Sequence, residues 1–377
     1  MSASNIEWTD RVWNPVTGCT KVSQGCKFCY AETIANRKLP HGGFTDRPFT
    51  TVRTHEDRLT QPMKWRKSQR VFVNSMSDLF HESVPFEFID KVCAVMALSP
   101  KHTFQILTKR PERLAEYFSD IALRQELVGI DAEHIGGIDR FMLNVGNAED
   151  GKPRWPLPLP NVWLGVSVEN QEQADKRIPL LLQTPAAVRF VSYEPALGPV
   201  DFKRLIGGGQ TIHVSADVEG LIRNKEFGFL QEDGQKLPKR EAEAWLRAAL
   251  ERGVKRLRCS DSCEGFSDAT GCPGHRHPKL DWMIVGGESG PKARPFDLAW
   301  ARSTVEQCKA AGVACFVKQL GTVPMTTDDL TFAEISMRNQ RRMPKGFKAF
   351  GLDDRKGGDM AEWPEDLRVR QFPVVPA

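Results

Sequence analysis

The chain has 377 residues, of which 40% are hydrophobic and 27% are charged, and its 52 basic and 48 acidic residues give a net charge of +4. This length and composition are ordinary for a globular protein, and the charge is too small to indicate nucleic-acid binding by itself. No apolar run approaches the roughly 18 residues of a membrane span, and the first ten residues, MSASNIEWTD, lack the features of a secretory signal. We therefore expect a cytoplasmic protein without a membrane partner.

Seven segments have the composition of buried parallel strands, being rich in β-branched and aromatic residues and ending in polar ones. The first lies near Trp13, and the others cover residues 71–78, 104–109, 162–169, 188–194, 282–288 and 314–319. Helical patterns lie between several of them, over residues 86–98, 111–118, 170–183 and 296–311. This alternation predicts parallel βα units. It favours an α/β fold, a full or partial (β/α) TIM-like barrel, over an open doubly wound sheet, because no Gly-rich nucleotide fingerprint follows the first strand.

Two stretches interrupt the alternation of strands and helices. Residues 129–160 show no clear period and predict a long loop. Residues 207–278 predict an inserted subdomain that is rich in cysteine and histidine, with one amphipathic helix over 239–252. It is expected to be basic over residues 223–258, which hold ten basic and six acidic residues. The barrel is then expected to comprise residues 1–206 and 279–325, followed by a C-terminal extension over 326–377.

Three cysteines gather in the segment WNPVTGCTKVSQGCKFCYAE, where Cys19, Cys26 and Cys29 have the spacing C-x6-C-x2-C. The chain has nine cysteines, an odd number, and no export signal, so clustered thiols indicate metal ligands rather than disulfides. Three thiolates leave one iron of a 4Fe–4S cluster open, and that iron can chelate S-adenosylmethionine (SAM). A zinc site, which normally takes four ligands and could include His41, is the alternative.

The sequence CKFC followed by Tyr30 resembles the radical SAM signature, in which an apolar or aromatic residue precedes the third cysteine. Phe28 would be that residue, beside the adenine, although the first gap has six residues where the usual signature has three. The combination of IEWTD, WNP, SMSDLFHE, LTKRP, NVWLGVSVE, YEPALGP, DWMIVGGESG and FVKQ resembles a phage- and plasmid-associated family of unknown function. That family is similar to radical SAM proteins, with spore photoproduct lyase among its characterised neighbours. The resemblance runs from Ile6 to about Gly321, apart from the insertions.

Polar residues follow most of the predicted strands, at the face where parallel barrels carry their chemistry. Side-chain alternation predicts that Ser167 and Glu169 point inward, and that Lys318 shares a face with Phe316 and not with Cys315. Together with the resemblance, this gives candidate SAM-binding residues Phe28, Ser75, Ser77, Asp78, Ser167 and Glu169. The candidate catalytic residues are Lys109, Glu194, Glu288 and Lys318. The alternative is that these acids only form ion pairs that close the barrel mouth.

A second group of metal-ligand residues lies in the predicted insertion, within RCSDSCEGFSDATGCPGHRHP. Their density favours a structural zinc site on Cys259, Cys263, Cys272 and His275, while a second iron–sulfur cluster and unligated thiols remain alternatives. The neighbouring basic helix and Trp245 indicate either a nucleic-acid or partner contact, or a solvated face.

These features predict a radical SAM-type enzyme that uses a 4Fe–4S cluster to cleave SAM and generate a 5′-deoxyadenosyl radical. The resemblance to spore photoproduct lyase favours a nucleic-acid base as the substrate, which is an argument by analogy. The expected partners are an electron donor of the flavodoxin or ferredoxin type and DNA or RNA. The rival interpretation is a non-catalytic zinc-binding module that contacts nucleic acid or phage proteins.

Overall fold

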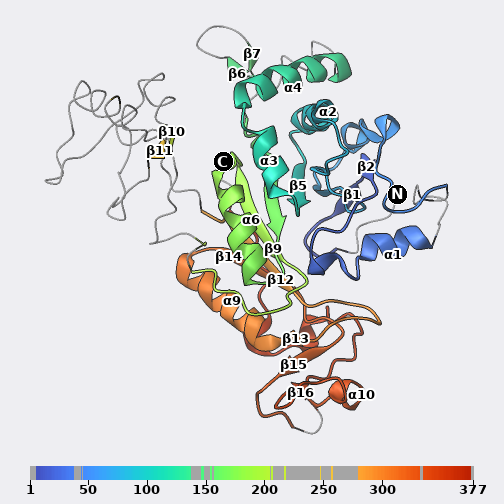
Figure 1. The fold of residues 1–377 in the computed structure, drawn as a ribbon, viewed down its shortest axis with the longest axis vertical. Helices are drawn as coiled ribbons and strands as arrows, with labels where there is room; N and C mark the ends of the chain where they lie inside the picture. Colours follow the sequence, from blue (N-terminus) through green and yellow to red (C-terminus); the bar gives the residue numbers. More distant parts are fainter. Residues whose placement is uncertain are drawn as a thin grey trace, which may run out of the picture. The chain divides into compact units, whose positions relative to one another are not determined.

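The computed structural model describes residues 6–37, 44, 46–136, 146–147, 153–154, 157–203, 205–206, 216–217, 247, 256–257, 279–331 and 334–374. The chain divides into two compact units, one formed by Met1–Ile206 with Leu280–Ala377 and the other by Gly207–Lys279. The first unit contains the sheet and helices described below (Figure 1). In the second unit, β10 (Ala216–Asp217) pairs antiparallel with β11 (Arg256–Leu257).

The first unit is built on a seven-stranded parallel sheet that curls into a half-barrel (Figure 1). The predicted set of parallel strands is thereby confirmed, as a partial α/β barrel. Neighbouring strands follow the chain order because each crossover returns the chain beside the strand it left. The strands, in sheet order, are β1 (Arg11–Trp13), β4 (Arg70–Val73), β5 (Thr103–Thr108), β8 (Val162–Ser167), β9 (Val188–Tyr193), β12 (Trp282–Gly286) and β14 (Ala314–Gln319).

Apart from α10 (Met337–Gln340), which follows the last strand of the sheet, the described helices lie in crossovers between these strands. The crossover helices are α1 (Tyr30–Asn36), α2 (Phe86–Ala97), α3 (Pro111–Tyr117), α4 (Ile121–Gly136), α6 (Gln171–Gln183) and α9 (Leu298–Ala311). The sequence favours the start of one helix and the end of another. At the start of α6, the Asn170 side chain accepts a hydrogen bond from the Gln173 N–H at 3.0 Å. At the end of α9, Gly312 adopts the left-handed conformation.

Short strand pairs complete the described structure. They are β2 (Val16–Thr17) with β3 (Arg53–Thr54), β6 (Gly146–Asn147) with β7 (Pro153–Arg154), and the three-stranded set β13 (Phe296–Asp297), β15 (Pro324–Thr326) and β16 (Lys348–Ala349). The last set lies with α10 at the lower end of Figure 1. Within the part of the chain that the structure describes, no helix has the length and apolar character needed to cross a membrane.

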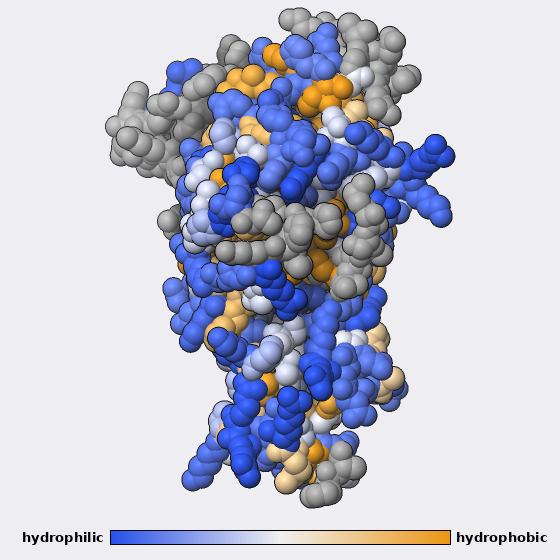
Figure 2. Space-filling view, turned by 90° about the vertical axis from the view of Figure 1, so that its right-hand side faces the viewer, coloured by the Kyte–Doolittle hydropathy of each residue, from blue (hydrophilic) through white to orange (hydrophobic). Residues whose placement is uncertain are grey.

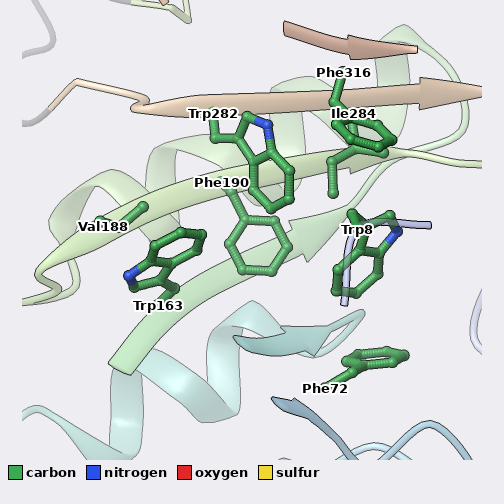
Figure 3. Packing of buried hydrophobic residues seen from close by; sticks show 8 residues of the cluster. All are labelled: Trp8, Phe72, Trp163, Val188, Phe190, Trp282, Ile284 and Phe316. Atoms are coloured by element: carbon green, nitrogen blue, oxygen red, sulfur yellow. The ribbon is translucent and has the colours of Figure 1, made fainter. Parts of the chain in front are cut away.

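Large aromatic side chains fill the concave side of the sheet below its carboxyl ends. Figure 3 shows Phe72, Trp163, Phe190, Trp282 and Phe316 from different strands, gathered with Trp8, which precedes β1. The ring centroids of Trp163 and Trp282 are 5.8 Å apart, and those of Trp8 and Phe72 are 4.8 Å apart. Burial of such rings supplies much of the favourable free energy of folding. On the face drawn in Figure 2, by contrast, hydrophilic residues dominate the coloured surface and hydrophobic ones form small separate areas.

The C-terminal part of the described chain covers one edge of the sheet. Near the C-terminus, the Val317 N–H donates to Val369 and the Gln371 N–H donates to Cys315, each at 2.8 Å, which covers the free edge of β14. Phe372 then packs at 5.3 Å from Trp282, inside the curve of the sheet. The aromatic core is therefore sealed at the end opposite the strand carboxyl termini.

The predicted loop over 129–160 is wrong at its start, residues 129–136, and the predicted zinc site lies outside the described residues. Helix α4 runs to Gly136, into the stretch predicted to begin a long loop at residue 129. Its sequence, IALRQELVGIDAEHIG, lacks a clean apolar stripe, so packing against α2 stabilises a helix that periodicity does not reveal. The predicted zinc ligands Cys259, Cys263, Cys272 and His275 and the predicted helix over 239–252, apart from Arg247, lie outside the described residues.

Candidate functional site

A cavity of about 440 Å³ lies at the carboxyl ends of the parallel strands. This volume is in the range of sites that enclose small molecules and cofactors. Its wall combines the aromatic residues above the core with polar residues that follow β4, β5, β8, β9, β12 and β14. The position agrees with the rule that parallel α/β sheets bind ligands beyond the carboxyl ends of their strands.

All three cysteines of the C-x6-C-x2-C segment line this cavity. Cys19, Cys26 and Cys29 are half-buried free thiols on residues 19–29, which we call the cysteine loop. Cys19 and Cys29 pack against a small apolar cluster formed by Ala31, Ala35, Phe44 and Phe49. The loop therefore presents three sulfur atoms to one cavity while part of its surface is removed from water.

The surroundings of two of these thiols disfavour a bare thiolate. Burial raises the pKa of Cys19 to about 12, and the Asp78 carboxylate adds to the rise although Arg110 opposes it. Burial also raises the pKa of Cys29, while the backbone N–H groups of Glu32 and Ala31 lower it. Both thiols hold their protons at neutral pH, and a bound cation would have to displace them.

Arg110, which follows β5, holds the start of the cysteine loop. Its guanidinium donates to the Thr20 hydroxyl at 2.9 Å and lies 3.6 Å from the Cys19 Sγ. Asp78 at 3.2 Å and Glu82 at 2.9 Å fix the guanidinium in turn. The buried Asp78 carboxylate also accepts hydrogen bonds from Phe80, Thr108 and Lys109. Asp78 thus acts on the loop through Arg110.

Glu169, which follows β8, holds the middle of the loop. Its carboxylate is fully buried, accepts a hydrogen bond from the Ser23 hydroxyl at 2.6 Å and pairs with Arg177 at 3.2 Å. Lys109 Nζ lies 3.5 Å from the same carboxylate. Gly25 lies directly against it, because a Cβ at this position would overlap the Glu169 side chain.

Glu288, which follows β12, acts on the same loop through Arg294. The Arg294 side chain grips the Glu288 carboxylate with two hydrogen bonds, at 2.8 and 2.9 Å. Its remaining nitrogen donates to the main-chain oxygen of Gln24 at 3.0 Å, and the guanidinium lies 5.3 Å from the Phe28 ring centroid. Three ion-pair networks from three strand ends therefore hold one loop, which is how a ligand set is preorganised.

The chemistry of the donor set decides which group could bind here. Within the described part of the chain, no three His, Cys, Asp or Glu side chains lie close enough together to share a single metal ion. A 4Fe–4S cluster binds each thiolate to a different iron, so its ligands lie farther apart than those of one ion. Three soft sulfur donors on the wall of one roomy cavity are of the type that such a cluster takes. His41, the fourth ligand of the zinc alternative, lies outside the described residues.

Comparison with known proteins places the chain in a family. The model of a family described as "Protein of unknown function (DUF5131)" matches residues 3–353. The chain belongs to the DUF5131 family. No curated protein and no solved structure matched it. The match names no activity, cofactor or substrate, so the chemistry of a DUF5131 protein has to be argued from its site.

In this DUF5131 protein, the predicted SAM-binding residues divide into two groups. Phe28, Ser75, Ser77 and Ser167 line the cavity together with Asp78. The Ser75 hydroxyl donates to Asn14 at 3.2 Å and the Ser77 hydroxyl to the Val16 oxygen at 2.8 Å, so both also tie β4 to the loop after β1. Glu169 lies beneath Gly25, outside the residues that line the cavity.

The predicted catalytic residues also reach the cavity of the DUF5131 fold. Lys109, Glu194, Glu288 and Lys318 all line it. Lys318 Nζ pairs with Glu194 at 3.1 Å, whereas Cys315 is buried on the other face of β14 against Cys308, as the alternation predicted. Glu288 is engaged by Arg294 and Lys109 by Glu169, whereas Glu194 and Lys318 pair with each other at the cavity wall.

Two arginines of this site were not predicted from the sequence. Arg177 lies on α6, two turns after Glu169, and Arg294 follows the GGESG segment. Because α6 begins directly after the end of β8, its first two turns lie near that strand end, and this closeness could have indicated the pairing of Arg177 with Glu169. No feature of the local sequence predicts the hydrogen bond from Arg294 to the main-chain oxygen of Gln24.

Proposed function

We propose that this protein is a radical SAM-type enzyme in which Cys19, Cys26 and Cys29 hold a 4Fe–4S cluster. The observation that supports this most is that the three thiols line the same cavity as the polar strand ends. When bound, such a cluster would supply the electron that cleaves SAM to methionine and a 5′-deoxyadenosyl radical. The substrate class we favour is a nucleic-acid base, and the electron would come from a protein of the flavodoxin or ferredoxin type.

The protein's own residues would position ligands and exclude water. The cysteine loop is held from three strand ends, which keeps its sulfur atoms in a fixed relation to the cavity. Phe28 offers a flat ring for adenine, and the hydroxyls of Ser75, Ser77 and Ser167 lie on the wall where the polar part of SAM would bind. Asp78 and Glu169 act as positioning residues for the loop, because arginines already occupy their carboxylates.

A second metal forms a separate part of the proposal. Cys259, Cys263, Cys272 and His275 would bind one structural zinc ion in the segment 207–278, whose basic stretch 223–258 would contact DNA or RNA. Metal analysis of the whole protein should then find zinc beside iron. Replacing Cys263 by serine should remove the zinc and leave the iron, and loss of iron instead would reverse the assignment.

The main test is anaerobic purification followed by quantitation of iron and sulfide. We expect a brown protein that releases methionine and 5′-deoxyadenosine when SAM and dithionite are added. Cys26→Ser should lose the iron, whereas the control Cys308→Ala should keep it, because Cys308 is a buried thiol between α9 and β14. A colourless protein that contains zinc alone would overturn the proposal in favour of the non-catalytic zinc module.

A further inference from the structure

Four carboxylates follow strands at the end of the sheet where the cavity lies, and three of them hold the cysteine loop. Those three are Asp78, Glu169 and Glu288. The fourth is Glu194, and among the hydrogen bonds and ion pairs of the described residues none joins it to the loop. Its carboxylate instead pairs with Lys318 Nζ at 3.1 Å and accepts a hydrogen bond from the Ser192 hydroxyl at 3.2 Å. Holding the loop therefore explains three carboxylates and leaves Glu194 for another role.

Glu194, Lys318 and Ser192 form a compact polar group on the cavity wall. They come from β9 and β14, on either side of β12, and Gly286 of β12 makes room for them. A Cβ at Gly286 would lie 2.8 Å from Glu194 Oε1. The Glu194 and Lys318 side chains are only 13% and 18% exposed, so water screens their attraction weakly. Both side chains nevertheless line the cavity.

The rest of the wall is suited to a flat, partly apolar molecule. Trp8, Phe28, Phe72 and Leu107 contribute apolar or aromatic surface. Asn74 and Gln319 are more than nine-tenths buried, and each has one amide atom without a hydrogen-bond partner. The Asn74 oxygen accepts from the Val16 N–H and the Gln319 nitrogen donates to Gly287, which leaves Asn74 as an unpaired donor and Gln319 as an unpaired acceptor.

We infer that Glu194 and Lys318, with Ser192, form a subsite that recognises the edge of a nucleobase. Such an edge presents a donor beside an acceptor: the donor would bind Glu194 and the acceptor Lys318, while the ring lies on the aromatic wall. Enzymes that act on single bases read them in this way, through edge hydrogen bonds and contacts to the ring faces. The inference deepens the proposed function, because it assigns the substrate end of the same cavity.

The test is titration of the full-length protein with the four 2′-deoxynucleoside 5′-monophosphates, with 2-deoxyribose 5-phosphate as the ligand that lacks a base. We expect at least one nucleotide to bind and the sugar phosphate not to bind. Glu194→Gln and Lys318→Met should each weaken binding about tenfold or more, since a bidentate edge contact discriminates by about 1–3 kcal/mol. The matched control is Lys91→Met, because Lys91 pairs with Glu56 at 2.9 Å on the exposed surface. Melting curves of each variant separate lost binding from lost folding.

Three results would overturn the inference: no binding of any nucleotide, equal binding of the sugar phosphate, or unchanged affinity in folded Glu194→Gln and Lys318→Met proteins. The same titration on the Cys26→Ser protein separates the two proposals. Nucleotide binding without iron or SAM cleavage would support the subsite, whatever becomes of the radical chemistry. SAM cleavage by a protein that binds no nucleotide would keep the proposed enzyme class and remove the nucleobase subsite.

Discussion

Replacing Asp78 by asparagine should destabilise the protein strongly, because the carboxylate is buried and satisfies several donors at once. Asp78 and Arg110 expose only 8% and 5% of their side chains, and the other carboxylate near Arg110, Glu82, is 65% exposed. Removing one partner of a buried pair leaves an uncompensated charge and costs about 3–5 kcal/mol. In addition, the new amide group would direct its N–H atoms toward donors that now approach the carboxylate.

A loss of about 4 kcal/mol should lower the melting temperature of a unit of about 300 residues by roughly 6 °C. Circular dichroism melts of the wild type and of Asp78→Asn measure it directly. The control Glu56→Gln breaks an exposed pair with Lys91 and should change stability by at most about 1 kcal/mol.

A double-mutant cycle with Arg110→Met tests the cause of the loss. The double variant should be less destabilised than the sum of the two single variants, because no unpaired charge remains. An Asp78→Asn protein that melts within a degree or two of the wild type would refute the reasoning. The carboxylate would then be free to serve as a direct SAM ligand.

Three further outcomes follow from the same geometry. Gly25→Ala should lower iron incorporation without unfolding the barrel, because the new methyl group displaces the loop from Glu169; iron content beside a melting curve checks this. Arg294→Lys should speed iron loss to a chelator, since lysine cannot grip Glu288 with two nitrogens and also reach the loop. Burial lowers the pKa of His55 from 6.5 to about 4, so the stability that the neutral ring contributes should be lost as pH falls through this window. The melting temperature of His55→Gln should fall less than that of the wild type between pH 6.5 and 4, and parallel curves would contradict the assignment.

The sequence alone was sufficient to predict the architecture and the polar rim. The apolar composition of strands such as β8 and β14 predicts that they are buried. The alternation of side chains along β14 predicts that Lys318 and Cys315 lie on opposite faces of the strand, as they do. Caps such as Asn170 and Gly312 are equally local signals. Helix α4 was not predicted, because packing against α2 stabilises it and its own sequence has no clear helical periodicity.

Only the tertiary structure decided what each rim residue does. In the sequence, Asp78, Glu169, Glu194 and Glu288 look alike, as acids that each follow a strand. In the folded chain, Asp78, Glu169 and Glu288 each pair with an arginine and help to hold the cysteine loop, whereas Glu194 pairs with Lys318. Arg294 and Gln24, for example, are separated by 270 positions in the chain. Local patterns determine which residues are buried, but partners this distant depend on how the curled sheet brings its strand ends together around one cavity.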